Sequence, residues 1–312
     1  MKILCIQLRQ MGDVIMTTPA VRQLRAVYPE AEIVFMTEPL GANVYKNNPH
    51  ISRLWSVPRK QCVGESLKLF WEVYREGFDL VVDFFSNPKS AQITWASRAK
   101  ERVGFDFTGR RYAYTRSVAL PDSKEYAAKS KNRLIEHLGG DLDDVETLFN
   151  PDETARNDAR EFAETYAFGE KCVAFCVVSR RDYKLLPPEF FAKVGDGLIG
   201  QGYRLFFVYG PGEKDMADAV YGLLTNKEAG IVEYDMPDIQ QLAAILGHCR
   251  VYVGNDGGSK HLSVCAGIPT VTVFHEVKAE NWTPPGHTAF QVETGVLPEE
   301  VIRSVAEIVL KS

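Results

Sequence analysis

Short apolar runs rich in β-branched residues alternate with amphipathic helical patterns along most of this 312-residue chain. In the first half, strands are predicted at 3–8, 33–36 and 80–84 and helices at 18–27 and 67–74. In the second half, strands are predicted at 172–178, 203–209, 230–233, 251–253 and 270–274, and helices at 189–199, 216–224, 239–246, after 259 and at 298–310. Such alternation is typical of right-handed βαβ units. The pattern therefore predicts an α/β fold built from doubly wound, mostly parallel sheets.

The stretch 141–170 interrupts this alternation. It is polar and acidic, Asn150-Pro151 is a breaker, and a helix is predicted at 155–166 before a new strand begins. A composition shift followed by a fresh β-strand is typical of an interdomain connection. We therefore expect two Rossmann-like domains, residues 1–168 and 169–312.

Composition limits the function further. The chain is 45% hydrophobic and 25% charged, with a formal net charge of −5, which disfavours nucleic acid as a partner. The six cysteines lie mostly in apolar runs, and no Cys or His pairs complete a metal site, although Cys172 and Cys176 share a predicted strand face. No signal peptide or run of about 18 apolar residues is found, so a cytoplasmic location is expected.

Asp13 follows the first predicted strand, at a Gly12-Asp13 turn that opens a helix. A carboxylate there lies at the carboxyl edge of a parallel sheet, where open α/β folds bind their ligands. Asp is also a preferred helix N-cap, and spacing alone leaves both interpretations open. The dinucleotide fingerprint GxGxxG is absent after this strand, which weakens the case for a dehydrogenase.

A second candidate site is the turn after the strand predicted at 251–253. Gly257, Gly258 and Ser259 open a helix there, and we expect their backbone N–H groups to face a diphosphate. The alternative is a tight turn capped by Asp256. In the first domain, Arg59, Lys60 and Arg110 are candidates for binding an anionic glycan, because guanidinium and ammonium groups bind phosphate and carboxylate. Solvated surface charge is the alternative for each.

Two segments carry a resemblance to a known family. Met11-Gly12-Asp13 with Thr17-Thr18-Pro19, and Asn255-Asp256 with Gly258 and His261, resemble the two signatures of the family 9 glycosyltransferases. These are the bacterial heptosyltransferases that build the inner core of lipopolysaccharide. The resemblance implies the GT-B fold, in which two Rossmann-like domains face each other across a cleft and the last helix often packs back on the first domain.

The resemblance also implies roles for individual residues. By this resemblance, Asp13 corresponds to the catalytic base of the family. Ser179 and Lys184 correspond to residues that bind the phosphates of the donor, and Glu213 corresponds to a residue that binds the ribose hydroxyls. Asp256 and His261 match the donor signature. The alternatives are a solvated basic loop around Lys184 and a first-turn acid that favours the helix dipole at Glu213.

The chain also departs from the family pattern. Gly257 replaces a small hydroxyl residue, Ser259 a proline and Lys260 an apolar or small residue. Two interpretations of Lys260 are open: its ammonium contacts a donor phosphate or a carboxylate, or the side chain lies solvated on the helix. The segment His275-Glu276-Val277 replaces Gly-Pro-Thr, and His275 is either structural or ligand-binding.

The expected activity is inverting, metal-independent transfer of a sugar, with heptose from ADP-heptose favoured, to lipopolysaccharide core or a related glycan, with Asp13 as general base and no cofactor. The expected partners are a nucleotide-sugar donor and an anionic glycan or glycolipid acceptor. The chain is expected to be a monomer that makes at most peripheral contact with the inner face of the bacterial inner membrane. The alternatives are a sugar-nucleotide epimerase of the same fold and a non-catalytic family member that binds a glycan or nucleotide sugar.

Overall fold

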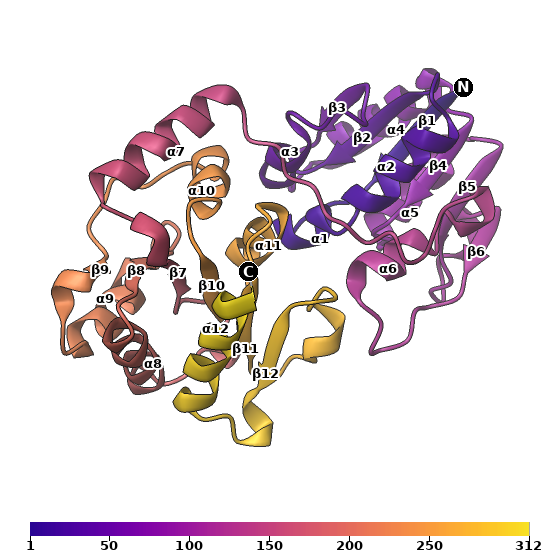
Figure 1. Ribbon diagram of the computed structural model, residues 1–312. Helices are drawn as coiled ribbons and strands as arrows, with labels where there is room; N and C mark the ends of the chain where they lie inside the picture. Colours follow the sequence, from indigo (N-terminus) through magenta and orange to yellow (C-terminus); the bar gives the residue numbers. More distant parts are fainter. Residues whose placement is uncertain (312) are drawn as a thin grey trace. The chain divides into compact units, whose positions relative to one another are not determined.

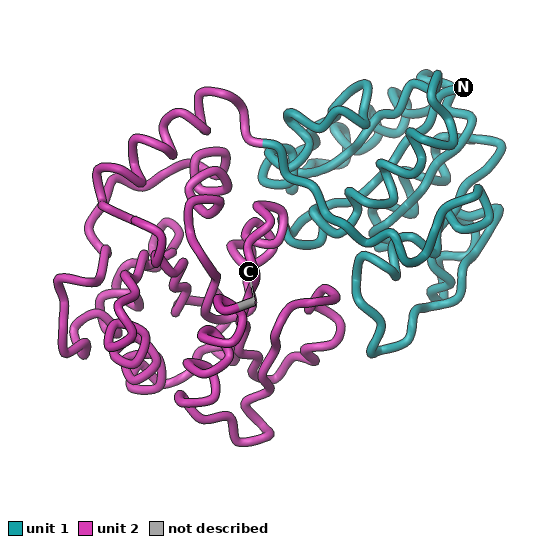
Figure 2. Tube along the Cα trace, viewed as in Figure 1, with its two compact units in different colours: residues 1–150 teal, residues 151–312 magenta. Residues whose placement is uncertain are grey.

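The computed structural model describes residues 1–311, and residue 311 only by its place in a helix. The chain forms two compact units, residues 1–150 and 151–312 (Figure 2). The division therefore falls before helix α7 (Glu153–Thr165) and not at residue 168 as expected, because α7 packs on α10 (Ile239–Leu246) of the second unit. Gln241 Nε2 of α10 donates to Asp158 of α7 at 2.8 Å.

Unit 1 contains a parallel sheet in the order β3-β2-β1-β4-β5-β6 (Figure 1). Its strands are β1 (Lys2–Ile6), β2 (Glu32–Thr37), β3 (Arg53–Ser56), β4 (Leu80–Asp83), β5 (Glu101–Phe105) and β6 (Arg116–Val118). Its helices are α1 (Met11–Ile15), α2 (Thr18–Val27), α3 (Pro39–Tyr45), α4 (Val63–Glu76), α5 (Pro88–Ala96) and α6 (Ala127–Asn132). The strand order reverses between β1 and β4, and in such sheets the crevice at this reversal is the ligand site.

Unit 2 repeats the same winding, with the order β12-β11-β10-β7-β8-β9. Its strands are β7 (Cys172–Cys176), β8 (Arg204–Phe207), β9 (Gly230–Ile231), β10 (Val251–Asn255), β11 (Thr270–Phe274) and β12 (Thr288–Gln291). Besides α7 and α10, its helices are α8 (Pro188–Gly200), α9 (Lys214–Leu223), α11 (Gly258–Cys265) and α12 (Pro298–Lys311), and α12 packs on α8. Here the order reverses between β7 and β10.

The central strands are buried on both faces because helices cover both sides of each sheet. Residues 3–6 of β1 and 172–175 of β7 are fully buried, so these strands read as continuous apolar runs. Strands β7 and β10 approach each other closely at Gly254, whose φ is +155°. A Cβ at this position would lie 2.0 Å from the carbonyl oxygen of Cys176. Only glycine fits there.

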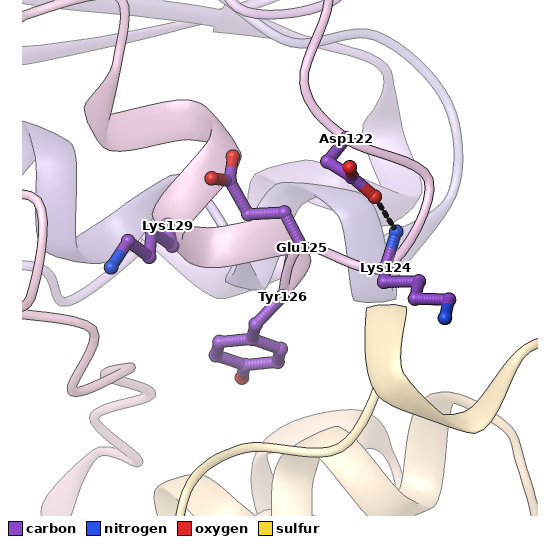
Figure 3. Close-up of a pocket in the computed structure, with 5 residues that line it drawn as sticks. All are labelled: Asp122, Lys124, Glu125, Tyr126 and Lys129. Atoms are coloured by element: carbon purple, nitrogen blue, oxygen red, sulfur yellow. Dashed lines mark hydrogen bonds between the residues drawn. The ribbon is translucent and has the colours of Figure 1, made fainter.

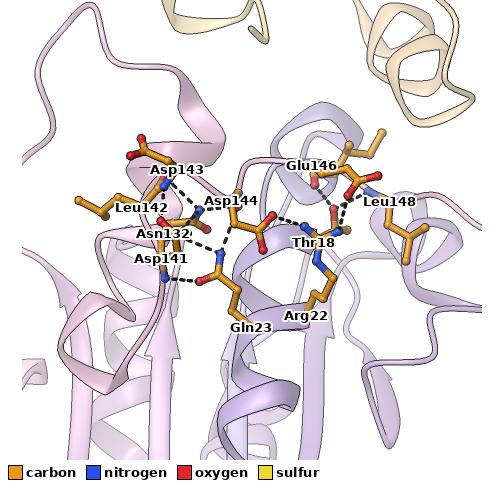
Figure 4. A network of polar contacts seen from close by, with 11 residues as sticks. Thr18, Arg22, Gln23, Asn132, Asp141, Leu142, Asp143, Asp144, Glu146 and Leu148 are labelled. Atoms are coloured by element: carbon orange, nitrogen blue, oxygen red, sulfur yellow. Dashed lines mark hydrogen bonds and ion pairs between the residues drawn. The ribbon is translucent and has the colours of Figure 1, made fainter.

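A polar network fastens the last segment of unit 1, residues 141–148, to helices α2 and α6 (Figure 4). Gln23 Nε2 donates to the carbonyl of Asp144 at 3.1 Å, and Asn132 Nδ2 donates to the same carbonyl at 2.8 Å. Arg22 forms an ion pair with the Asp144 carboxylate. These contacts fix α2, which begins directly after the short helix that carries Asp13.

The sequence pattern identified the central strands but missed the outer ones. Strands β3, β5, β6 and β12 were not predicted, because charged residues such as Arg53, Glu101 and Arg116 interrupt their apolar patterns. Helices α3, α5 and α6 were also missed. Over residues 1–311, none of the helices has the length and apolar character that crossing a bilayer requires.

Candidate active site

Asp13 lies in the first turn of α1, the first helix after β1, at the reversal point of the first sheet. Its side chain is half-buried. The N-cap residue of this helix is Gln10, and Asp13 is the third helical residue. The N-cap interpretation of Asp13 is therefore wrong, and the carboxylate is placed at the sheet edge where ligands bind.

A second carboxylate, Asp83, ends the adjacent strand β4 and is fully buried. Its Oδ1 accepts hydrogen bonds from the N–H groups of Phe85 at 3.1 Å and Ser86 at 2.8 Å, and its Oδ2 accepts one from the Tyr114 hydroxyl at 2.8 Å. Burial raises the pKa of Asp83, and these hydrogen bonds offset only part of the rise. Sequence analysis missed Asp83, although it lies at the end of a buried strand.

Lys131 of α6 supplies a cation beside these acids. Its Nζ donates to the carbonyl of Phe84 at 2.6 Å. Burial lowers the pKa of Lys131, while the charges of Asp13 and Asp83 oppose that shift. Lys131 therefore lies within electrostatic reach of the candidate base. No local pattern marks it, since its position depends on how α6 packs.

The three candidate acceptor residues occupy two different loops. Arg110 Nη1 donates to the carbonyl of Ser86 at 2.8 Å, and its guanidinium lies over the Phe107 ring at 4.7 Å. Arg110 is thus attached to the loop after β4, beside Asp83. Arg59 and Lys60 are exposed in the loop after β3, and β2 separates β3 from β1. The structure therefore brings Arg110 to the reversal point and leaves Arg59 and Lys60 further along the sheet edge.

Unit 1 also has an open hollow before and along α6, lined by Asp122, Lys124, Glu125, Tyr126 and Lys129 (Figure 3). The backbone N–H of Lys124 donates to Asp122 Oδ1 at 2.8 Å, which closes a local turn. The hollow is lined by none of the residues that the sequence predicts for the site.

In unit 2, the loops after β7 and β10 meet at Asp256. Lys184 Nζ donates to Asp256 Oδ2 at 2.7 Å, and Lys260 Nζ donates to Asp256 Oδ1 at 2.5 Å. Asp256 therefore bonds two lysines and does not cap α11, whose N-cap is Gly257. The basic-loop alternative for Lys184 is wrong, because its ammonium is held in a largely buried ion pair.

Lys260 is 1% exposed, which excludes a solvated position. Its Nζ also donates to the carbonyl of Trp282 at 2.8 Å and lies 5.0 Å from the centre of the Phe274 ring. Burial alone would raise the pKa of Asp256, but the adjacent ammonium groups, Lys260 first, hold it well below its usual range. Burial lowers the pKa of Lys260, and the Asp256 carboxylate opposes that shift.

The glycine turn itself is open. Gly257 has extended backbone, and a Cβ there would meet no atom within 4 Å among the described residues, so a hydroxyl residue would also fit. Gly258 is the first residue of α11. The Ser259 hydroxyl donates to Cys176 Sγ at 3.2 Å and thus contacts β7. The first turn of α11 presents backbone N–H groups next to this turn.

His261 is buried, with its ring edge towards the Trp282 ring at a centroid distance of 6.1 Å. Burial, assisted by the charge of Lys260, lowers the pKa of His261 to about 3. The imidazole is therefore neutral at pH 7. Its Nδ1 has no hydrogen-bond partner within residues 1–311, and the same is true of Nδ1 of His275.

Glu213 connects the loops after β7 and β8. Its Oε2 accepts from the Gly210 N–H at 2.7 Å, and its Oε1 accepts from Arg180 Nε at 3.1 Å. The Ser179 hydroxyl accepts from the Arg181 N–H at 3.1 Å. Both predicted donor residues thus lie at the carboxyl edge of the second sheet, where their polar atoms already bond to neighbouring loop residues.

Two parallel six-stranded sheets of the same Rossmann-type order, each flanked by helices, form an α/β fold that matches the GT-B fold of heptosyltransferases. Solved structures agree with this fold. The structure of a glycosyltransferase family 9 protein from Veillonella parvula has a TM-score of 0.88 at 23% identity and covers 100% of this chain and 98% of its own. The structure of Escherichia coli heptosyltransferase WaaC with ADP-2-deoxy-2-fluoro heptose has a TM-score of 0.74 at 20% identity, covering 98% and 99%.

The sequence comparison gives the family. The family model described as glycosyltransferase family 9 (heptosyltransferase) matches residues 66–305, which is more than half of the chain. Lipopolysaccharide heptosyltransferase 3 of Escherichia coli is 22% identical over 299 residues, covering 91% of this chain and 86% of that protein. The chain belongs to glycosyltransferase family 9 and is a glycosyltransferase of the heptosyltransferase type.

Proposed function

We propose that this chain transfers a heptose from ADP-heptose onto a lipopolysaccharide core or a related anionic glycan. Two comparisons support this substrate pair. A relative over most of the chain is named a lipopolysaccharide heptosyltransferase, and a heptosyltransferase of the same fold has been solved with an ADP-heptose analogue. We also propose that the chain works as a monomer on the cytoplasmic side of the membrane, with at most peripheral contact through its glycolipid acceptor.

In the proposed mechanism, Asp13 is the general base. An acceptor hydroxyl oxygen attacks the anomeric carbon of the donor while the bond from that carbon to the phosphate oxygen breaks. ADP leaves with the bonding electrons, the hydroxyl proton passes to Asp13, and the configuration at the anomeric carbon inverts. A carboxylate is a weak base, but it has only to accept a proton that becomes acidic during the step. The Lys131 ammonium lies within electrostatic reach of Asp13.

Unit 2 would hold the donor without a metal ion. Negative charge accumulates on the leaving diphosphate, and cations and N–H donors at fixed positions stabilise it. The donor's phosphates would be bound by Lys184, by the Ser179 hydroxyl and by the backbone N–H groups of the Gly257-Gly258 turn at the start of α11. Glu213 is suited to the ribose hydroxyls because each carboxylate oxygen has two lone pairs, so both can accept a hydroxyl besides their bonds to Gly210 and Arg180. Asp256 would hold the lysines of the donor site in place, and Ser259 and His261 would complete the site from the first turns of α11.

Unit 1 would bind the acceptor. Arg110, beside the Asp83 loop, is the candidate nearest the reversal point, while Arg59 and Lys60 would contact more distant anionic groups of the glycan. The observation that carries the whole proposal is the pair of charged reversal points. A half-buried carboxylate follows β1, and two lysines that share the single carboxylate of Asp256 follow β7 and β10.

The test is to compare Asp13→Asn with the wild-type chain in transfer from ADP-heptose and in binding of ADP. The variant should lose about 10²- to 10⁴-fold in kcat, because a general base contributes about that much, and ADP affinity should be unchanged. Asp143→Asn, at an exposed aspartate of the same unit, is the control and should keep full activity. Activity of Asp13→Asn within about tenfold of wild type would contradict the base role. Epimerised free sugar nucleotide formed without acceptor would instead favour the epimerase.

A further inference from the structure

The two lysines that share Asp256 have different surroundings. Lys260 is 1% exposed, and its ammonium also bonds to the Trp282 carbonyl. The Lys184 side chain is 19% exposed and follows three exposed residues of the loop after β7, 181–183. Lys260 is thus enclosed by protein, whereas Lys184 comes from an open loop at the sheet edge. Only Lys184 is placed to exchange its partner.

The two ion pairs have a clear consequence for charge. Asp256 contributes one negative charge, Lys184 and Lys260 contribute two positive charges, and His261 is neutral because its pKa is lowered to about 3. The group therefore carries one excess positive charge beside the open turn at Gly257. A diphosphate brought to this turn would compete with Asp256 for the Lys184 ammonium.

If Lys184 moved to a diphosphate, the buried Asp256 carboxylate would lose one of its two ammonium partners. Removing the partner of a buried charge carries a large free-energy penalty, because the remaining ion is neither solvated nor paired. In this chain Asp256 would keep its 2.5 Å bond to Lys260, so the penalty is avoided. If residue 260 were apolar or small, as in the family signature that the chain otherwise resembles, Lys184 would be the remaining ammonium on Asp256.

We propose that Lys260 is a positioning residue that holds the charge of Asp256, so that Lys184 is released to bind the donor's diphosphate. The inference rests on the proposed function, since it requires a diphosphate donor at this turn. It assigns the chain's departure at residue 260 a role in donor affinity. Lys260 itself stays buried between Asp256 and the Trp282 carbonyl and does not touch the donor.

The test is a calorimetric titration of the full chain with ADP in metal-free buffer. Lys260→Met should weaken ADP binding by about 10- to 100-fold, because Lys184 stays on Asp256 and one charge-assisted hydrogen bond to the phosphate is lost. The double variant Lys260→Met with Asp256→Asn should regain the affinity of Asp256→Asn alone, because no carboxylate then retains Lys184. Lys193→Met, at an exposed lysine of α8, is the control and should bind ADP as wild type does.

Recovery of ADP binding in the double variant distinguishes a positioning role of Lys260 from a purely structural one. If Lys260 only supports the fold, the second substitution will not restore binding, and that result overturns the inference. Loss of ADP binding in Asp256→Asn alone also overturns it, because the carboxylate would then be a ligand itself. Circular dichroism of each variant checks folding, and a misfolded Lys260→Met is replaced by Lys260→Gln in the same pair of titrations.

Inorganic pyrophosphate is titrated in parallel to distinguish the two proposals. A wild-type chain that binds pyrophosphate but not ADP would refute ADP as the nucleotide of the donor. The role of Lys260 would then be decided by titrating the same variants with pyrophosphate. A wild-type chain that binds neither would overturn both proposals.

Discussion

Gly254→Ala tests the packing that holds the donor loops together. Gly254 lies in β10 with φ +155°, a conformation that is strained for alanine. Its Cβ would meet the carbonyl oxygen of Cys176 at 2.0 Å and the carbonyl carbon at 2.7 Å. Both are backbone atoms of the adjacent strand β7, so no side-chain rotation relieves the clash. The two strands must move apart or bend.

The magnitude follows from two contributions. A strained backbone conformation costs about 1–3 kcal/mol, and overpacking of a rigid interior costs about as much again. The sum, about 2–6 kcal/mol, is large beside the 5–15 kcal/mol that usually stabilises a folded domain. Any separation of β7 from β10 also disturbs the 2.7 Å ion pair between Lys184 and Asp256, whose loops follow these strands.

The assay is urea unfolding of the full chain, followed by hydrogen exchange of peptides that cover β7 and β10. Gly257→Ala is the matched control, because a Cβ there meets nothing within 4 Å among the described residues and φ is −168°. Gly254→Ala should unfold at much lower urea concentration, and Gly257→Ala should behave as wild type. A difference between the two variants below about 1 kcal/mol would refute the packing argument.

Two further predictions concern pH and metal ions. Burial lowers the pKa of His261 to about 3, whereas an unfolded histidine titrates near 6.5, so the unfolded state binds more protons between these values. Stability should therefore fall as the pH is lowered through this window, by about 2 kcal/mol at about pH 5, and His261→Gln should flatten the dependence; an unchanged pH profile of the melting temperature would contradict this. Transfer activity should be unaffected by EDTA, because lysines and backbone N–H groups serve the leaving diphosphate; a loss of activity that Mg²⁺ restores would show that a metal ion takes part.

The parts of the fold that depend on local patterns were predictable. The helix at 18–27, the helix at 239–246 and the strand at 270–274 lie where their apolar periodicity placed them. The doubly wound α/β class is confirmed as well. The edge strands β3, β6 and β12 were not predictable in the same way, because an edge strand needs a continuous apolar run less than a central one does. The domain boundary was displaced because packing, and not composition, assigns α7 to the second unit.

The candidate site was predictable to a lesser degree. Asp13 and the Gly257 turn were found because each follows an apolar strand directly. Asp256 and Lys260 are four residues apart across the start of α11, so their pairing could have been predicted from the sequence. The pairing of Asp256 with Lys184 joins residues 72 positions apart and depends on β7 lying beside β10. Lys131 reaches the neighbourhood of Asp13 only through tertiary packing.

The central claim is that the loops after β7 and β10 bind the diphosphate of a nucleotide sugar. Hydrogen exchange of the full chain with and without saturating ADP tests this most directly. ADP should slow exchange in peptides covering 177–185 and 254–262, at the carboxyl ends of these two strands. Protection confined to unit 1, or no protection at either loop when ADP is bound, would contradict the claim.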